Sequence, residues 1–191
     1  MINAELGHVK TLKQFHKEIR AAQEEAHGDF YCAQHDALIK YMEDCDSYME
    51  LGTHQGGTAS AAMLCKPSKI VLVDNDMHRY EKFLKPLAET FCKRKKIDLT
   101  VKEIDSTSPK STAKVDMLLI DSYHHPAHMN RELMMHQVNI KKYIIAHDTS
   151  ILHGKPNSSL YETLELFCKT YPWEIIERGM KNVGYTVLKR L

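Results

Sequence analysis

Two polar segments in the second half of the sequence combine carboxylates with imidazoles. One contains Asp121 and His124, and the other contains His147 and Asp148. Each follows a short apolar run that is typical of a buried strand, so both segments should reach the same edge of a parallel sheet. Carboxylate and imidazole groups that meet there can act as general bases or hold a divalent cation. The pattern predicts Asp121, His124 and His147 as catalytic residues and, as an open alternative, a metal site at Asp121, His147 and Asp148.

A glycine-rich segment, ELGTHQGGT at residues 50–58, lies between an apolar run and a helix-forming stretch. Glycines allow a tight turn and a close approach of the backbone to a ligand, and the following helix presents its positive end there. A turn that serves only packing is the alternative interpretation. The carboxylate of Glu50 can attract an ammonium group. The predicted ligand contacts in this loop are Glu50, Gly52, Thr53, Gly56, Gly57 and Thr58.

Polar residues also end the next two predicted strands. Asp74, followed by Asn75, comes roughly 20 positions after the glycine turn, where an acidic residue commonly binds the hydroxyls of a ribose. Asp105 and Ser106 are placed to meet an adenine edge. The alternatives are a helix cap for Asp74 and a turn for Asp105 and Ser106. NAD is disfavoured, because Thr53 and His54 stand where a dinucleotide loop needs its second glycine.

The elements that would position these residues alternate along the chain. Apolar residues at helical spacing predict helices around 9–19 and 33–42. From residue 47 onward, short apolar runs alternate with amphipathic stretches, which is typical of a parallel sheet with crossover helices. The predicted strands are 48–51, 69–73, 98–104, 115–120, 143–146, 173–177 and 183–188. The predicted helices in this part begin at 57 and span 77–95, 127–138 and 158–171.

These elements predict an α/β fold with one Rossmann-like, doubly wound sheet of about seven strands. The sheet should be mostly parallel, with an antiparallel C-terminal strand, because the last two strands have a short connection. Two parts are expected: N-terminal helices over residues 1–46, as a cap or acceptor-site element, and the sheet-containing domain over residues 47–191.

Composition narrows the class of protein. The chain has 191 residues, enough for one domain, and a formal net charge of +1 that provides no general field for nucleic acid. Its five cysteines are scattered singly, and neither a signal peptide nor a membrane-spanning run is evident. We therefore expect a cytoplasmic protein with no membrane or nucleic-acid partner, and leave a homo-oligomer open.

The motifs ELGTHQGGT, VD, IDS, LIDSYH and AHDT, in this order, resemble those of class I S-adenosylmethionine-dependent methyltransferases. The sequence is most similar to the group that contains rhamnosyl and macrocin O-methyltransferases and the enzymes named cephalosporin hydroxylase. In that group an Asp ends the fourth strand and a His follows at the third position, as in Asp121 and His124. Glu132 and Leu133 in the next helix also fit, and the resemblance covers roughly residues 47–190.

The resemblance implies S-adenosylmethionine as cofactor and O-methylation of a small hydroxylated molecule or a sugar. By likeness, the loop at 50–58 would hold the methionine part, Asp74 the ribose, and Asp105 with Ser106 the adenine side. Members of the group can bind Mg²⁺ through an Asp at the fourth strand and an acidic pair at the fifth. Here the pair is His147 and Asp148, so a softer divalent metal fits better than Mg²⁺.

Two other classes stay open. A metal-dependent hydrolase could use the carboxylates and imidazoles without a nucleoside, and a non-catalytic module could bind S-adenosylmethionine without transferring its methyl group. Methylation of nucleic-acid bases is disfavoured, because the Pro-Pro-aromatic tetrad of amino-directed enzymes is replaced here by residues 121–124, Asp-Ser-Tyr-His.

Overall fold

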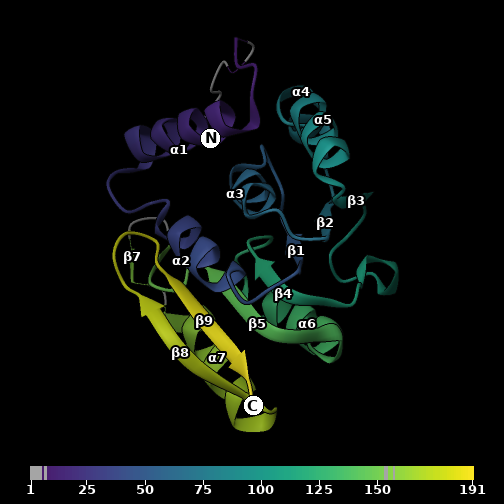
Figure 1. The fold of residues 1–191 in the computed structure, drawn as a ribbon. Coiled ribbons are helices and arrows are strands. Elements are labelled where there is room, and N and C mark those ends of the chain that lie inside the picture. Colours follow the sequence, from purple (N-terminus) through teal and green to yellow (C-terminus); the bar gives the residue numbers. More distant parts are fainter. Residues whose placement is uncertain (1–5, 7, 153–154, 157) are drawn as a thin grey trace.

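The computed structural model describes residues 6, 8–152, 155–156 and 158–191. Seven strands form one sheet in the order β3-β2-β1-β4-β5-β9-β8 (Figure 1). All neighbours are parallel except for β9, which runs antiparallel to both β5 and β8. The predicted sheet is confirmed. Its strands are β1 (Ser47–Leu51), β2 (Lys69–Asp74), β3 (Asp98–Glu103), β4 (Val115–Ile120), β5 (Ile140–His147), β8 (Trp173–Gly179) and β9 (Tyr185–Arg190).

The order of the strands reverses at β1, which pairs with β2 on one side and β4 on the other. Every residue of β1 and of β4 is buried, as expected for strands that are covered on both faces. In such sheets the crevice beyond the carboxyl ends of the two central strands is where ligands bind. The glycine loop leaves β1 at this point, and Asp121 follows β4 directly.

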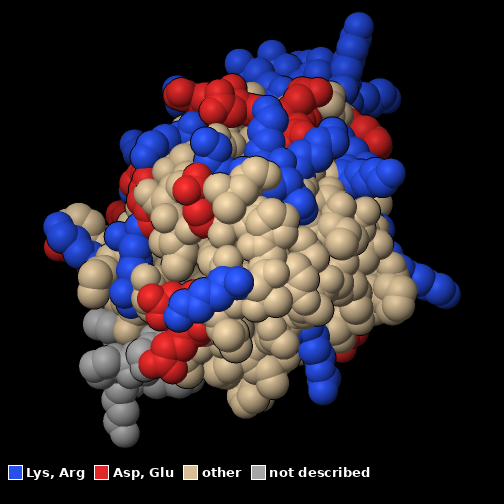
Figure 2. All heavy atoms as spheres, turned by 90° about the horizontal axis from the view of Figure 1, so that it is seen from below, with Lys and Arg blue, Asp and Glu red and all other residues tan. Residues whose placement is uncertain are grey.

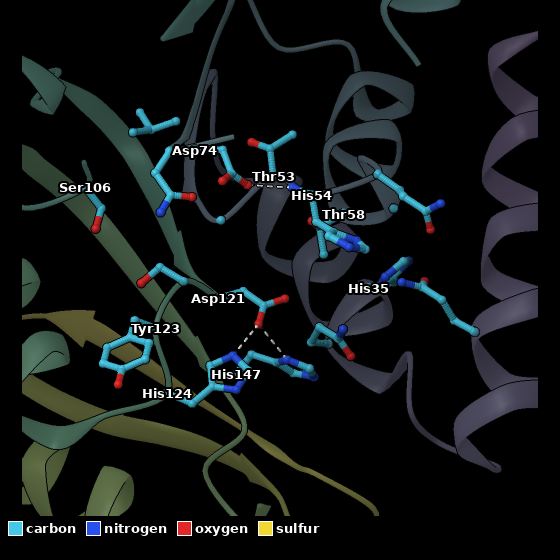
Figure 3. A pocket seen from close by; sticks show the side chains of 18 of the residues that line it. His35, Thr53, His54, Thr58, Asp74, Ser106, Asp121, Tyr123, His124 and His147 are labelled. Carbon is cyan, nitrogen blue, oxygen red and sulfur yellow. Dashed lines mark hydrogen bonds and ion pairs between the residues drawn. The ribbon is translucent and has the colours of Figure 1, made fainter. Parts of the chain in front are cut away.

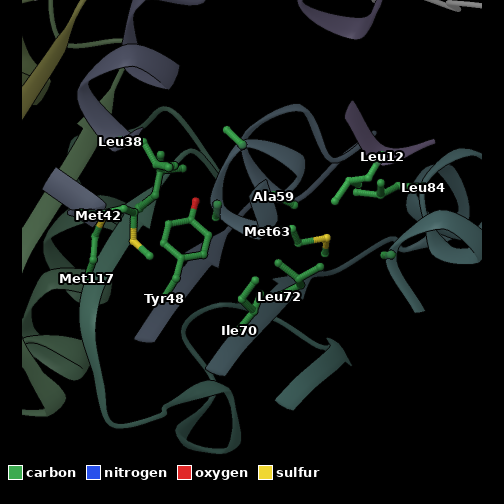
Figure 4. Close-up of a cluster of buried hydrophobic side chains, with 14 of the residues drawn as sticks. Leu12, Leu38, Met42, Tyr48, Ala59, Met63, Ile70, Leu72, Leu84 and Met117 are labelled. Carbon is green, nitrogen blue, oxygen red and sulfur yellow. The ribbon is translucent and has the colours of Figure 1, made fainter. Parts of the chain in front are cut away.

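Helices cover both faces of the sheet. Their bounds are α1 (Leu12–His27), α2 (Ala33–Met42), α3 (Gly57–Cys65), α4 (His78–Phe83), α5 (Lys85–Lys95), α6 (Pro126–His136) and α7 (Ser158–Thr170). The first five helices pack around one apolar core, which includes Leu38, Met63 and Leu72 (Figure 4). Helices α6 and α7 pack on the other face around Leu133 and Leu164.

The prediction of one helix over residues 77–95 is wrong, because the structure has two helices, α4 and α5, that are separated at Leu84. Pro86 lies in the first turn of α5. A proline has no N–H to donate to the carbonyl four residues earlier, and its ring clashes with that carbonyl, so the first helix must end before it. A small hairpin of β6 (Ile151–Leu152) and β7 (Lys155–Pro156) was not predicted, since two-residue strands carry no periodicity.

Hydrogen bonds join the N-terminal helices to the C-terminal hairpin of β8 and β9. The side-chain amide of Asn182, in the turn between β8 and β9, donates to backbone carbonyls at residues 27–29, at the end of α1 and directly after it. Glu177 of β8 accepts hydrogen bonds from Tyr41 at 2.9 Å and from Lys40 at 2.5 Å. The N-terminal helices are therefore held against the sheet by its C-terminal hairpin.

Figure 2 shows the face seen from below, where basic and acidic side chains alternate along one border and the centre carries few charges. This face has no extended field of one sign. None of the helices in the described part of the chain has the length and apolar character that crossing a membrane requires.

Candidate functional site

A cavity of about 510 Å³ lies beyond the carboxyl ends of β1, β2 and β4 (Figure 3). Most residues that the sequence singled out line it. They are Gly52, Thr53, Gly57, Thr58, Asp74, Asn75, Asp105, Ser106, Asp121, His124 and His147. Three of the predicted residues do not line the cavity: Glu50, Gly56 and Asp148. Glu50 and Asp148 are buried behind the lining residues. The strand ends thus bring together segments that are up to 95 residues apart, from Gly52 to His147.

The glycine loop needs its glycines for close contacts. Gly52 has a φ of +92°, and a Cβ atom there would lie 2.0 Å from the carbonyl oxygen of Asp121. Gly56, with a φ of +85°, precedes the first residue of α3, and no side chain in the described part of the chain caps that helix. The first amide groups of α3 are therefore left to a ligand, as at other helix N-termini that bind anions.

Glu50 lies fully buried beneath the loop. The hydroxyl of Tyr48 donates to its Oε2 at 2.8 Å, but Oε1 has no partner among the described residues. Burial raises the pKa of Glu50 to about 8, although polar contacts with Tyr48, Thr58 and Thr53 oppose the shift. A buried acid of this kind is neutral at pH 7 until a positive charge comes close to it.

Asp74 organises the loop beside it. Its Oδ2 accepts a hydrogen bond from the amide of His54 at 2.8 Å, and its Oδ1 accepts one from the amide of Asp76 at 3.1 Å. The residue that caps α4 is Met77, so the helix-cap alternative for Asp74 is wrong. Each carboxylate oxygen keeps a further lone pair for a ligand in the cavity.

Asp105 forms a turn, as its alternative interpretation held, because its Oδ1 accepts from both the amide and the hydroxyl of Thr107. Ser106 is mostly buried, and its hydroxyl pairs with Nε2 of His128 at 3.1 Å. Behind them, the fully buried Glu132 accepts from the hydroxyl of Ser122 at 2.5 Å. This side of the cavity is thus lined by hydroxyl and imidazole groups.

Asp121, His124, His147 and Asp148 form one cluster across the cavity from the loop. His124 contacts Asp121 at 3.3 Å and Asp148 at 2.5 Å with its two ring nitrogens, and Nδ1 of His147 lies 3.0 Å from Asp121. Although burial lowers the pKa of His124, its bonds to the two carboxylates raise that pKa to about 10. Burial works against ionisation of Asp121, yet the charge of His147 and the hydrogen bonds hold the pKa of Asp121 below its usual range.

The cluster has a donor set that fits a divalent metal. One ligand atom each from Asp121, His124 and Asp148 lies within 4.8 Å of the others. The imidazole of this group is that of His124, whereas the sequence predicted His147, which packs against the two carboxylates from the buried side. A mixed set of nitrogen and oxygen donors suits Mn²⁺ or Zn²⁺ better than Mg²⁺.

The N-terminal helices contribute lining residues that the sequence did not indicate. These are Gln23, His27, Tyr31, Gln34 and His35. No motif marks these residues. The one indication of a role was that two polar residues, Gln34 and His35, lie on the buried side of α2 together with its apolar residues. The ring edge of Tyr31 meets His147, with the ring centres 5.9 Å apart. The predicted role of residues 1–46 as a cap stays a prediction, whereas the structure places parts of α1, α2 and the segment between them in the wall of the cavity.

No family model matches the sequence, and no curated protein matches it either. Solved structures do match in fold. An O-methyltransferase from Bacillus cereus in complex with S-adenosylhomocysteine is 16% identical with a TM-score of 0.61, over 94% of this chain and 90% of that one. A Staphylococcus aureus protein named as a candidate caffeoyl-CoA O-methyltransferase is 10% identical with a TM-score of 0.69, over 97% and 94%.

A third match is a branched-chain polyamine synthase from Thermus thermophilus in complex with 5′-methylthioadenosine. It is 14% identical with a TM-score of 0.61, over 82% of this chain and 55% of that one. These likenesses establish that the chain has the Rossmann-like fold of class I methyltransferases. The narrower resemblance to the rhamnosyl and macrocin group stays a prediction.

Proposed function

We propose that this protein is an S-adenosylmethionine-dependent O-methyltransferase of a small hydroxylated molecule or a sugar. The observation that carries the proposal is the opposition of two groups across one cavity: the glycine loop and Asp74 on one side, with Glu50 buried behind them, and the cluster of Asp121, His124 and His147 on the other. The first group suits an adenosyl amino acid, and the second suits a hydroxyl that must lose a proton.

The cofactor would lie over the carboxyl ends of β1 and β2. In this placement, Asp74 accepts the ribose hydroxyls, Glu50 attracts the ammonium of the methionine part from behind the loop, and Ser106 lies at the adenine side. Gly52 allows the backbone to pass close beneath. The sulfonium methyl group would then point toward Asp121, since that residue lies at the end of the neighbouring strand.

Methyl transfer from a sulfonium requires an acceptor oxygen in line with the departing sulfur, so the protein acts mainly by orienting the two molecules. Asp121 or His147 would take the proton of the acceptor hydroxyl. A divalent metal held by Asp121, His124 and Asp148 would lower the pKa of that hydroxyl. His124 and Tyr31, which line the cavity beside Asp121 and His147, would contact the acceptor.

The direct test is titration calorimetry with S-adenosylmethionine, S-adenosylhomocysteine and NAD, each with and without Mg²⁺ or Mn²⁺. We expect both sulfur nucleosides to bind and NAD to give no heat of binding. Failure of both sulfur nucleosides to bind would overturn the proposal, and metal-dependent hydrolysis without them would favour the hydrolase alternative. Binding without transfer to any acceptor would indicate the non-catalytic module.

The Asp74→Asn variant is expected to bind S-adenosylhomocysteine about 10- to 100-fold more weakly, because hydrogen bonds to a charged acceptor contribute about 1.5–3 kcal/mol. An asparagine oxygen can still accept from the amide of His54, so the loop should keep its shape. The control is Asp76→Asn in the same turn, outside the cavity lining. Equal affinities in the Asp74 variant and the wild type would exclude Asp74 as the ribose ligand.

The Asp121→Asn and Asp148→Asn variants are expected to lower methyl transfer at least about 100-fold, the usual scale for loss of general-base catalysis. The assay follows transfer of a labelled methyl group to whichever phenol or sugar of a panel supports turnover. Asp98→Asn, at the opposite end of the sheet, is the control. Full activity in both cluster variants would remove these carboxylates from the mechanism.

A further inference from the structure

Strand β3 lies at one margin of the sheet, and its outer side pairs with no strand in the described part of the chain (Figure 1). The amide of Asp98 donates to the carbonyl of Ser68, on the side of β2. Because successive residues of a strand direct their backbone groups to alternate sides, the N–H and C=O groups of Leu99 and Val101 point outward. Such a row of backbone groups is a template for another strand.

The centre of this outer edge is apolar. Val101 is 40% exposed, and Leu99 is partly buried. Exposed edges are usually protected by a central Lys or Pro, whereas here the charges of Asp98 and Lys102 stand toward the ends of the strand. The ammonium of Lys102 donates to backbone carbonyls at residues 110–112, so it acts on a neighbouring strand through its charge. An apolar strand with complementary ends would therefore fit this edge.

The sequence of β3 is complementary to an antiparallel copy of itself. In the register centred on Thr100, Leu99 of each copy stands opposite Val101 of the other, and their outward backbone groups meet. The two Thr100 side chains lie together on the twofold axis. Asp98 stands opposite Lys102, with the opposite charge. Apolar, Thr–Thr and opposite-charge pairs of this kind all stabilise antiparallel strands.

The neighbouring registers that the backbone allows lack this complementarity. The register centred on Val101 places the apolar Leu99 opposite the carboxylate of Glu103. The register centred on Leu99 brings Lys96 toward Lys102, and like charges directly opposite each other are destabilising. The register centred on Thr100 is therefore the favoured one.

A stripe of charges beside β3 has the same property. Four side chains at intervals of four residues alternate in sign along α4 and α5: Glu81, Lys85, Glu89 and Lys93. All four line a cavity of about 550 Å³ between these helices and β3. Within one copy, Lys85 donates to Glu81 at 2.8 Å. The rotation that pairs the strands also sets α5 antiparallel to its copy, on the same face of the sheet, so each Glu of one stripe faces a Lys of the other.

We propose that the chain forms a twofold homodimer in which β3 pairs with β3 of a second copy and the sheet continues from one copy into the other. The second copy also covers the cavity between α5 and β3. A formal net charge of +1 gives little repulsion between two copies. None of the residues of β3 or of the charged stripe lines the cavity of the candidate functional site, so the dimer is independent of the proposed function.

The first test is sedimentation equilibrium of the full chain over a range of micromolar concentrations. We expect a monomer–dimer equilibrium, and Val101→Lys should weaken the dimer about tenfold or more, because it removes two apolar pairs and places a charge opposite Leu99 of each copy. Val138→Lys is the control, since Val138 is 70% exposed and lies outside the proposed interface. A wild-type protein that stays monomeric, or a dimer that Val101→Lys leaves equally tight, would overturn the proposal.

The second test examines the register. The Cα atoms of the two Thr100 residues would be about 4.5 Å apart, within the range that a disulfide spans, so Thr100→Cys should form a covalent dimer under mild oxidation. Asp98→Cys should not, because its two copies would be about 13 Å apart along the strands. The wild type gives the background from the native cysteines. No covalent dimer in Thr100→Cys, or equal yields in both variants, would contradict the pairing.

Discussion

Above pH 8 the Glu50→Gln variant is expected to be more stable than the wild-type protein, and at pH 7 it is expected to bind S-adenosylhomocysteine at least about 100-fold more weakly. The two effects have one cause. Glu50 is completely buried, and its pKa is about 8, above the value of 4.5 for an exposed glutamate. The charged form of Glu50 therefore lowers the stability of the fold, yet this charge is the one that would attract the ammonium group of the proposed ligand.

The pH dependence has a definite sign. Between pH 4.5 and about 8, the folded protein binds a proton at Glu50 that the unfolded chain has released. Stability therefore falls as the pH rises through this window, by up to about 1.4 kcal/mol per pH unit from this group. Glutamine does not titrate, so the gain in the variant should be near zero at pH 4, grow through the window and level off above pH 8.

Urea unfolding at several pH values measures the stability effect, and calorimetry measures the binding effect. The control ligand is 5′-methylthioadenosine, which lacks the ammonium and should bind equally to both proteins. A stability difference that stays constant between pH 4 and pH 9 would contradict the buried acid, and unchanged affinity for S-adenosylhomocysteine would remove Glu50 from the cofactor site.

The Gly52→Ala variant is expected to lose about 4 kcal/mol of stability or more. The new Cβ atom would lie 2.0 Å from the carbonyl oxygen and 2.5 Å from the carbonyl carbon of Asp121, both of which are backbone atoms that no rotamer change can move. Relief requires the ends of β1 and β4 to separate, and the hydrogen bond from the amide of Asp121 to the carbonyl of Leu51 holds them together. Overpacking at a rigid contact adds to the cost of the positive φ.

Gly28 provides a matched control, because its φ of +90° is almost the same as the +92° of Gly52. A Cβ atom at Gly28 would meet no atom closer than the side-chain nitrogen of Asn182 at 3.7 Å. Gly28→Ala should therefore lose only the conformational cost, about 1–3 kcal/mol. Urea unfolding of both variants gives the comparison, and similar losses would show that the contact between β1 and β4 can relax.

The sequence predicted the sheet well because its strands are short apolar runs bounded by polar residues, and because each strand end carries its own signal. Asp74 and Asp121 follow such runs directly, so their meeting at one edge could be inferred without coordinates. The break at Leu84 was missed although Pro86 was visible, because the amphipathic pattern continues on both sides of it.

Other parts of the site were beyond sequence reasoning. Both His124 and His147 contact the two carboxylates, and which imidazole stands in the candidate metal group depends on the backbone after β5, where Asp148 has a φ of +57° and turns away from a regular strand. The contribution of α2 depends on packing between helices that are distant in sequence from the loop at 50–58. Neither His35 nor Gln23 belongs to a motif, so only the three-dimensional arrangement could place them beside Gly57.

The hydrogen bonds of Asn182 bear on when the wall of the cavity becomes fully supported. They connect residues up to 155 positions apart, so this support of the wall made by α1 and α2 comes from a part of the chain that is synthesised much later. A nascent chain that ends before β8 has the glycine loop and Asp121 but not the hairpin that fastens the turn at 27–29. Closing so long a loop costs entropy that only the finished sheet can offset, so ligand binding should be acquired late in folding.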